Sequence, residues 1–267
     1  MHPELRSYHR TLFEACGRQH WWPARTRFEV IVGAFLTQST AWTNVERALR
    51  RLRTSGLLTI NGIRETPVAR LETLIRSAGY FRQKARRLKM FVEFVDKNYG
   101  GSLGRMFAQP TEKLRQEFLG LNGIGPETAD SILLYAGNHP IFVVDAYTRR
   151  ILARHNIVAE RAPYEEIRHL WELALSSLAT DSRHWKQAAT RNQKRETLFP
   201  SHRPSPMSIA KRSGLAQVYN EMHGLIVGVG KNYCLKSNPL CAECPLGKFL
   251  PSRIEQSGVS RHHSPNS

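Results

Sequence analysis

The stretch Leu121-Asn122-Gly123-Ile124-Gly125-Pro126-Glu127-Thr128-Ala129 places two glycines just before a proline that can begin a helix. Glycines at this spacing allow a tight turn with outward-pointing main-chain N–H groups, and proline tolerates the first helical position. A helix N-terminus of this kind suits an anion. We therefore expect Leu121, Gly123, Gly125 and Thr128 to form a phosphate-binding element, with an ordinary corner between helices as the alternative.

A lone carboxylate, Asp145, follows the apolar run Ile141-Phe142-Val143-Val144 and lies eighteen residues after Glu127. At this position it could carry out chemistry beside the phosphate-binding element. Asp145 also stands where an N-cap would serve a helix running through Tyr147 and Leu152. The position is therefore compatible with a catalytic role or with capping alone.

Composition and charge narrow the class of partner. The chain has 267 residues, 41% of them hydrophobic, which is enough for one large domain or two smaller lobes. Its net charge of +17 favours a polyanionic partner, above all nucleic acid, although a basic surface without a dedicated partner is the alternative. An apolar run of membrane-spanning length is absent, so we expect no membrane partner. The N-terminus lacks the apolar core of a signal peptide, and we expect a cytoplasmic, nucleoid-associated protein.

Hydrophobic periodicity predicts an all-α protein. Thr26 stands three residues before Glu29, a capping spacing, ahead of the apolar run from Phe28 to Leu36. The β-branched content of that run leaves a strand as the alternative. Thr111 is expected to open another helix.

Two segments interrupt this pattern. Residues 181–212 are basic and contain prolines, which predicts a flexible insertion that either tracks a DNA backbone or forms a solvated surface loop. Residues 251–267 have the composition of a disordered tail.

From His20 to about Pro245 the chain resembles the endonuclease III family of helix-hairpin-helix DNA glycosylases. Residues 121–129 match the family's hairpin, and Asp145 in Val143-Val144-Asp145-Ala146-Tyr147-Thr148-Arg149-Arg150 matches its catalytic aspartate. The segment Leu36-Thr37-Gln38-Ser39-Thr40 is similar to the one whose glutamine enters the gap left by an extruded base. Gly79-Tyr80 lies where the family has a second DNA-facing loop.

The resemblance implies a two-lobed fold with double-stranded DNA, containing a damaged base, bent in the cleft between the lobes. The first lobe, a six-helix lobe with the hairpin, would span residues 28–139. The second would combine residues 1–27 and 140–250 and carry the catalytic aspartate. Because a single lesion is asymmetric, we expect a monomer.

Glu127 departs from the family pattern, in which bifunctional members carry a lysine here. A lysine amine attacks C1′ of the sugar and forms a Schiff base that leads to strand cleavage, which a carboxylate cannot do. The sequence therefore predicts a monofunctional glycosylase without AP-lyase activity. Water would be the nucleophile, with Asp145 activating it or stabilising the oxocarbenium-like sugar. Glu127 would hold a water or contact the base, or would be only an exposed acid in the first helical turn.

The cysteines are the second departure. Cys234, Cys241 and Cys244 reproduce three ligands of the family's C-x6-C-x2-C-x5-C iron–sulfur site, but Leu250 occupies the fourth position. Three thiolates hold a cluster only if another ligand completes the iron. The resemblance thus implies a [4Fe-4S] site by ancestry, and we expect no cofactor or a degraded site.

Two alternatives to that interpretation stay open for the three cysteines. They could bind zinc with a histidine such as His223 or His262 as a further ligand. They could also lie in a loop that is held by packing alone.

Aromatic residues near the N-terminus are the expected base pocket. Trp21, Trp22, Pro23 and Trp42 resemble the pocket of the 3-methyladenine glycosylase branch of the family. Tryptophan faces sandwich a flipped base and favour a cationic one such as 3-methyladenine. Core packing is the alternative, and adjacent Trp21 and Trp22 could not both face the pocket from a helix.

Three functions therefore remain in view. The first is excision of alkylated purines. The second is excision of another lesion, such as an oxidised pyrimidine, uracil or a mismatched base, with or without strand nicking. The third is non-catalytic binding of damaged DNA.

Overall fold

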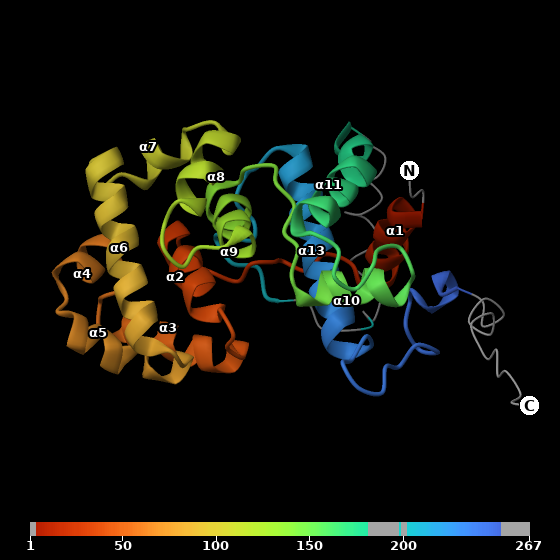
Figure 1. Cartoon of the computed structure of the whole chain (residues 1–267), viewed down its shortest axis with the longest axis horizontal. Helices are drawn as coiled ribbons and strands as arrows, with labels where there is room; N and C mark the ends of the chain where they lie inside the picture. The colour runs from red at the N-terminus through yellow and green to blue at the C-terminus, as the bar shows by residue number, and fades with distance from the viewer. Residues whose placement is uncertain (1–3, 181–197, 199–201, 252–267) are drawn as a thin grey trace, which may run out of the picture.

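The computed structural model describes residues 4–180, 198 and 202–251, and within these ranges every regular element is a helix. The prediction of an all-α fold is confirmed. Two groups of helices lie side by side along the long axis of the molecule (Figure 1). None of the described helices is long and apolar enough to span a membrane.

The first group comprises the helices between residues 27 and 137. In chain order they are α2 (Arg27–Thr37), α3 (Trp42–Thr54), α4 (Ile60–Glu65), α5 (Val68–Leu74), η1 (Arg76–Ala78), α6 (Phe81–Tyr99), α7 (Leu103–Phe107), α8 (Thr111–Leu119), α9 (Pro126–Ser131) and η2 (Ile132–Gly137). The second group is built from both ends of the chain. Its members are α1 (Glu4–Cys16), α10 (Ala146–Arg154), α11 (Tyr164–Leu175), η3 (Ser176–Thr180), α13 (Gly214–Asn232) and η4 (Gly247–Phe249).

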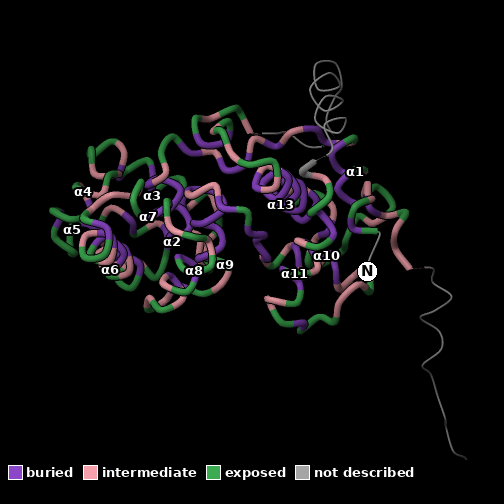
Figure 2. The backbone as a smooth tube through the Cα atoms, turned by 90° about the horizontal axis from the view of Figure 1, so that it is seen from above, coloured by how far each residue is buried: buried purple, intermediate pink, exposed green. Residues whose placement is uncertain are grey.

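Each group has a buried central helix. In the first group α2 packs against α3, α6 and η2, and all residues from Phe28 to Leu36 are buried. In the second group α13 packs against α1, α10 and α11, and Figure 2 shows it buried along most of its length. These two helices carry the apolar residues of the core toward the junction between the groups.

The apolar run from Phe28 to Leu36 is a helix and not a strand. Thr26 caps it, since its hydroxyl oxygen accepts a hydrogen bond from the Glu29 amide at 3.1 Å. In a full capping box the Glu29 carboxylate would accept a hydrogen bond from the Thr26 amide. Here it accepts one from the Arg25 amide instead and pairs with Arg53. Thr111 begins α8, as its position after a proline predicts.

Arg115 of α8 links the two helix groups. Its guanidinium donates to Asp130 of α9 at 2.7 Å and to Glu165 of α11 at 2.5 Å. The Tyr164 hydroxyl of α11 also donates to Asp130, at 2.9 Å. Because Arg115 and Asp130 are both buried, loss of either partner would leave an uncompensated charge in the interior. This network therefore holds α8 and α9 against α11.

The buried ammonium group of Lys84 connects two loops of the first group. It donates to the carbonyls of Leu36, Gln38 and Ala78 at 2.8, 2.9 and 2.8 Å, and to the Thr40 hydroxyl at 2.7 Å. Burial, reinforced by a nearby guanidinium, lowers the pKa of Lys84 to about 8, so the amine still carries its charge at neutral pH. The end of α2 and the segment before α6 are thereby fixed to each other.

Two predicted segments fall largely outside the described residues. Of the basic segment 181–212, residues 181–197 and 199–201 lie outside them, as do residues 252–267 of the predicted tail. The described residues of this segment, from 202 onward, pack against the rest of the protein. The Met207 amide, for example, donates a hydrogen bond to the Ala24 carbonyl at 3.1 Å.

Replacement of Lys84 by Met should destabilise the fold strongly. The buried Leu36 carbonyl would lose the ammonium donor, and the carbonyls of Gln38 and Ala78 would keep only the Thr40 hydroxyl, which can donate to one of them. One unpartnered buried polar group costs about 1–3 kcal/mol. We expect the free energy of unfolding, measured by urea denaturation, to fall by about 2 kcal/mol or more. Lys97→Met, at an exposed position of the same helix, is the matched control and should change it by less than about 0.5 kcal/mol. Equal losses in both variants would contradict the anchoring role.

Candidate active site

A tight hairpin joins α8 to α9. The Ile124 amide donates to the Leu121 carbonyl at 3.1 Å, and Pro126 occupies the first helical position of α9. A side chain placed at Gly125 would meet nothing within 4 Å, so the main chain before α9 is open to a partner. Leu121 is half-buried and packs against the core, which makes it a support of the hairpin.

Gln38 ties the loop after α2 to this hairpin. Its amide nitrogen donates to the Gly123 carbonyl and to the Thr128 hydroxyl, both at 3.0 Å, and its amide oxygen accepts from Arg87 at 2.6 Å. Gly123 has φ of 80°, and a Cβ there would collide with the Arg87 side chain. Three of the predicted DNA-binding residues, Gln38, Gly123 and Thr128, therefore lie together in one hydrogen-bonded unit.

Asp145 is the N-cap of α10. Its Oδ1 accepts from the Thr148 amide at 2.8 Å and from the Thr148 hydroxyl at 2.9 Å, and its own amide donates to that hydroxyl at 3.4 Å. This capping box fixes the plane of the carboxylate. The second oxygen, Oδ2, lies 3.6 Å from Nε2 of His223. Capping and exposure to a pocket are thus divided between the two oxygens of one carboxylate.

A pocket of about 770 Å³ lies at the junction of the helix groups. Its walls come from the loop before α2, the end of α2 with the loop after it, the first turns of α9 and α10, and α13. Among the predicted site residues it brings together Trp21, Trp22, Gln38, Trp42, Gly125, Glu127, Thr128 and Asp145. The pocket lining does not include Pro23, Leu121 and Gly123.

Aromatic rings form one wall of the pocket. The Trp22 ring lies edge-on to Trp42, with centroids 5.3 Å apart, and 5.2 Å from the ring of Tyr135. Trp21 and Trp22 both line the pocket although they are adjacent, because their segment is not helical. Both are nearly buried, at 7% exposure, so they pack in the core and also face the pocket.

Glu127 projects into the pocket from the first turn of α9. Its surface is open to the pocket, but the surrounding protein desolvates the carboxyl and raises its pKa to about 7, with a further contribution from Asp145. Arg149 opposes this shift. Water in the open pocket screens these charges, and a bound partner that excludes the water would strengthen the shift. Two carboxyl groups with different proton affinities therefore face one space.

Three residues of α13 line the pocket but were not predicted as pocket residues from the sequence. His223, Val227 and Lys231 lie on α13 at intervals of four, which places them on one face toward the pocket. Lys231 lies with its ammonium 5.8 Å from the Trp21 ring centre; its surface is exposed, but the surrounding protein partly desolvates the amine and lowers its pKa. The spacing of four is the signal that could have identified this face, but α13 is buried nearly all round, so its sequence does not reveal which face borders the pocket.

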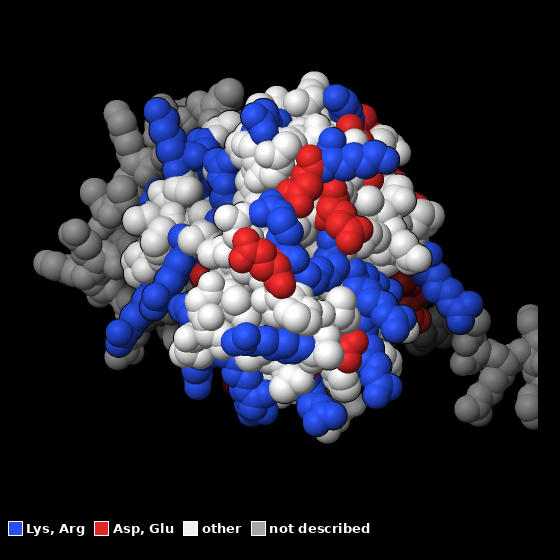
Figure 3. All heavy atoms as spheres, turned by 90° about the vertical axis from the view of Figure 1, so that its left-hand side faces the viewer, with Lys and Arg blue, Asp and Glu red and all other residues white. Residues whose placement is uncertain are grey.

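Positive charge is spread over the outer surface. Arg47, Arg50 and Arg51 of α3 are exposed, as are Arg82 and Arg86 of α6. Figure 3, which shows the left-hand end of Figure 1, has Lys and Arg side chains over the whole face with some Asp and Glu between them. The surface is therefore suited to a polyanion without being uniformly basic.

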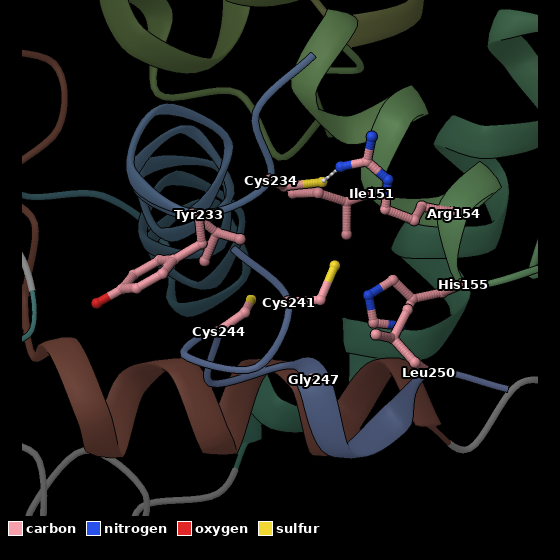
Figure 4. Close-up of a pocket in the computed structure, with 10 residues that line it drawn as sticks. Ile151, Arg154, His155, Tyr233, Cys234, Cys241, Cys244, Gly247 and Leu250 are labelled. Atoms are coloured by element: carbon pink, nitrogen blue, oxygen red, sulfur yellow. Dashed lines mark hydrogen bonds between the residues drawn. The ribbon is translucent and has the colours of Figure 1, made fainter. Parts of the chain in front are cut away.

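The cysteine loop does not present four ligands to a cluster. Cys234, Cys241 and Cys244 line a small apolar pocket with Leu250 in the fourth position (Figure 4). Within the described part of the chain, no group of three or more Cys, His, Asp or Glu is placed to hold a metal ion. The residues present thus do not fit a [4Fe-4S] cluster, and a degraded site stays our prediction. The Cys234 thiol accepts a hydrogen bond from Arg154 at 3.0 Å.

Of the two histidines considered for zinc, the one in the described part of the chain does not complete this set. His223 lies in the other pocket beside Asp145, and His262 falls outside the described residues. His155 borders the cysteines, but its Nδ1 is engaged by the Tyr8 hydroxyl at 2.7 Å.

Comparison with known proteins agrees with this architecture. Residues 32–175 match the HhH-GPD superfamily of base excision DNA repair proteins. A protein of Methanocaldococcus jannaschii, provisionally named a DNA repair glycosylase, is 38% identical over 92% of this chain and 94% of its own length.

Solved structures show the same fold. The Helicobacter pylori 3-methyladenine DNA glycosylase bound to 1,N6-ethenoadenine has a TM-score of 0.64 at 25% identity, covering 86% of this chain and 96% of that one. A non-covalent endonuclease III–DNA complex has a TM-score of 0.63 at 18% identity, covering 94% of each chain. The chain therefore belongs to the HhH-GPD superfamily of base excision DNA repair proteins, as an endonuclease III-like, helix-hairpin-helix DNA glycosylase.

Proposed function

We propose that this chain is a monofunctional DNA glycosylase that hydrolyses the N-glycosidic bond of alkylated purines such as 3-methyladenine after base flipping. The observation that carries the proposal is the pocket in which Trp22 and Trp42 share one space with Asp145 and Glu127. A carboxyl, not an amine, occupies the hairpin position from which bifunctional members attack the sugar. The H. pylori structure, a 3-methyladenine glycosylase with a bound purine derivative, supports this choice of substrate.

The pocket suits an extruded purine in size and in chemistry. Its volume of about 770 Å³ lies within the range of small-molecule sites. Tryptophan faces favour a cationic base by about 0.5–2 kcal/mol per desolvated contact. The positive charge of an alkylated purine also weakens its glycosidic bond, so that stacking and shape are sufficient for selection.

The two carboxyl groups would divide the reaction between them. Oδ2 of Asp145 accepts a proton from the attacking water, or stabilises positive charge on the sugar, while the bond from water oxygen to C1′ forms. The bond from C1′ to the base nitrogen breaks, and its electron pair leaves with the base. Glu127, which keeps its proton up to about pH 7, donates a hydrogen bond to the departing base.

We propose that the partner is double-stranded DNA with a damaged base, bound by a monomer in the cytoplasm beside the nucleoid. The lobes would be residues 28–139 and residues 1–27 with 140–250. The open main chain at Gly125 suits a DNA phosphate. Tyr80 is 68% exposed and offers an aromatic wedge to an unstacked base step. Gln38 would exchange its hydrogen bonds to the hairpin for bonds in the gap left by the base.

Lys231 is the observation that favours a second candidate function. Its side chain lines the same pocket as Asp145, and partial desolvation by the surrounding protein lowers the pKa of the amine, which makes the neutral, nucleophilic form more accessible. A Schiff base between this amine and C1′ would give an endonuclease III-like glycosylase with AP-lyase activity in spite of Glu127.

Asp145→Asn should abolish release of 3-methyladenine from methylated DNA. Asparagine can still cap α10, but it cannot accept a proton from water. We expect single-turnover release to fall by about 10²–10⁴-fold, with unchanged DNA affinity and thermal stability. Asp96→Asn, which alters an exposed ion pair on α6, is the control and should retain full activity. A wild-type protein that frees no methylated base would overturn the alkylpurine assignment.

The rate of base release should fall as pH rises above about 7, because Glu127 then loses its proton. Glutamine keeps an N–H donor at every pH, so Glu127→Gln should remove this basic limb of the profile. Single-turnover rates between pH 6 and 9 would test the expectation. If the rate of base release fell at the same pH in the wild type and in Glu127→Gln, the basic limb would belong to a group other than Glu127.

Borohydride trapping would separate the two candidate functions. We expect no covalent protein–DNA adduct and no nicked strand before alkali treatment, because Glu127 replaces the nucleophilic lysine. An adduct that forms with the wild-type protein and disappears in Lys231→Met would instead establish the lyase reaction through Lys231.

A further inference from the structure

His223 bridges Asp145 and a buried tyrosine. Its Nδ1 lies 2.5 Å from the Tyr135 hydroxyl, and its Nε2 lies 3.6 Å from Oδ2 of Asp145. The three side chains come from α13, η2 and the N-cap of α10. His223 and Tyr135 are 4% and 1% exposed, so solvent does not supply other partners for the ring nitrogens.

The hydrogen-bond chain has a single consistent direction. Burial raises the pKa of Tyr135 far above its ordinary value, so its hydroxyl keeps its proton. Burial also lowers the pKa of His223, although Asp145 opposes this, and the ring is neutral at physiological pH. Tyr135 therefore donates to Nδ1, and the ring proton resides on Nε2, directed at Asp145.

The contact between Nε2 and Asp145 is longer than a hydrogen bond. No other acceptor satisfies Nε2 in the described residues, where it is a buried polar atom without a hydrogen-bond partner. Oδ1 of Asp145 is already held twice by Thr148, so Oδ2 is the oxygen left for both His223 and the substrate. Catalytic hydrogen bonds are often long in free enzymes and tighten when the substrate binds.

We propose that His223, oriented by Tyr135, is a positioning residue that aims Oδ2 of Asp145 into the pocket through a neutral N–H donor. The inference rests on the proposed glycosylase function, because it assigns a task to that same carboxylate. A neutral donor orients the oxygen and leaves its negative charge in place. A lysine or arginine at this position would instead neutralise that charge. The carboxylate thus stays available to water or to the cationic sugar.

Other charged groups around this chain act on Tyr135. Glu127 of α9 and Asp145 raise the pKa of its hydroxyl, and Arg212 lowers it. Asp145 is the charged group that acts on His223 itself. The direction of the chain is therefore maintained across the neutral pH range.

The tautomer of His223 can be measured without any glycosylase substrate. Long-range ¹H–¹⁵N spectra of the full ¹⁵N-labelled chain should show the neutral ring with its proton on Nε2 between pH 7 and 8. Tyr135→Phe removes the donor to Nδ1, and we expect both tautomers to appear. A proton on Nδ1, or a charged ring at pH 7, would overturn the inference.

Single-turnover base release tests the consequence for the reaction. His223→Leu should slow release about tenfold or more and move the acid limb of the pH profile upward, because the carboxylate loses its donor. His223→Gln places an amide N–H near the position of Nε2 and should recover most of the rate. His139→Leu is the matched control, since His139 is also buried with an unpartnered Nε2 but lies beside Phe107. It should leave the acid limb unmoved.

The outcomes separate this inference from the function on which it rests. Wild-type rates in a folded His223→Leu protein, or equal slowing by Leu and Gln without a shift of the acid limb, would overturn the positioning role. A wild-type protein that releases no base from any lesion would reject the glycosylase proposal, while the tautomer measurement would still decide the arrangement of His223.

Discussion

The capping of α10 by Asp145 is the constraint on which the site depends. One carboxylate oxygen accepts two hydrogen bonds from Thr148, which ties the start of the helix to the carboxylate itself. The other oxygen is thereby held at the pocket, and His223 approaches it from α13. A flexible aspartate in a loop would lose this direction. Capping and the proposed catalysis are therefore complementary uses of one side chain, not the alternatives that the sequence pattern suggested.

The loops proposed to face DNA depend on a second set of buried polar contacts. Lys84 satisfies carbonyl groups at the end of α2 and before α6, and Gln38 bonds to the hairpin. These loops contain few apolar residues, so hydrogen bonds and not packing define their shape. The Arg115 network then fixes the hairpin helices against α11. Two of the pocket walls, the loop after α2 and the first turn of α9, are thereby bonded to each other and, through Arg115, to α11.

The same junction explains how one fold could support different reactions on the sugar. Glu127 stands at the hairpin position, and Lys231 reaches the pocket from the opposite helix group. In our proposal water attacks C1′, because the hairpin position carries a carboxyl group; the lyase reaction would instead require the Lys231 amine to reach C1′. The cysteine loop lies apart from this pocket. It lines a separate small pocket together with Leu250. Its departure from the family pattern therefore need not alter the chemistry of the pocket.

The sequence by itself determined the helical class, the hairpin at 121–129, the start of α2 at Thr26 and the position of Asp145 before α10. These features follow from local rules, since caps, tight turns and periodicity depend on residues only a few positions apart. Only the tertiary structure decided that Trp22, Glu127 and His223 face one pocket while Pro23 does not. Those residues come from distant segments, and their meeting is set by the packing of α2, α9, α10 and α13, which no local pattern encodes.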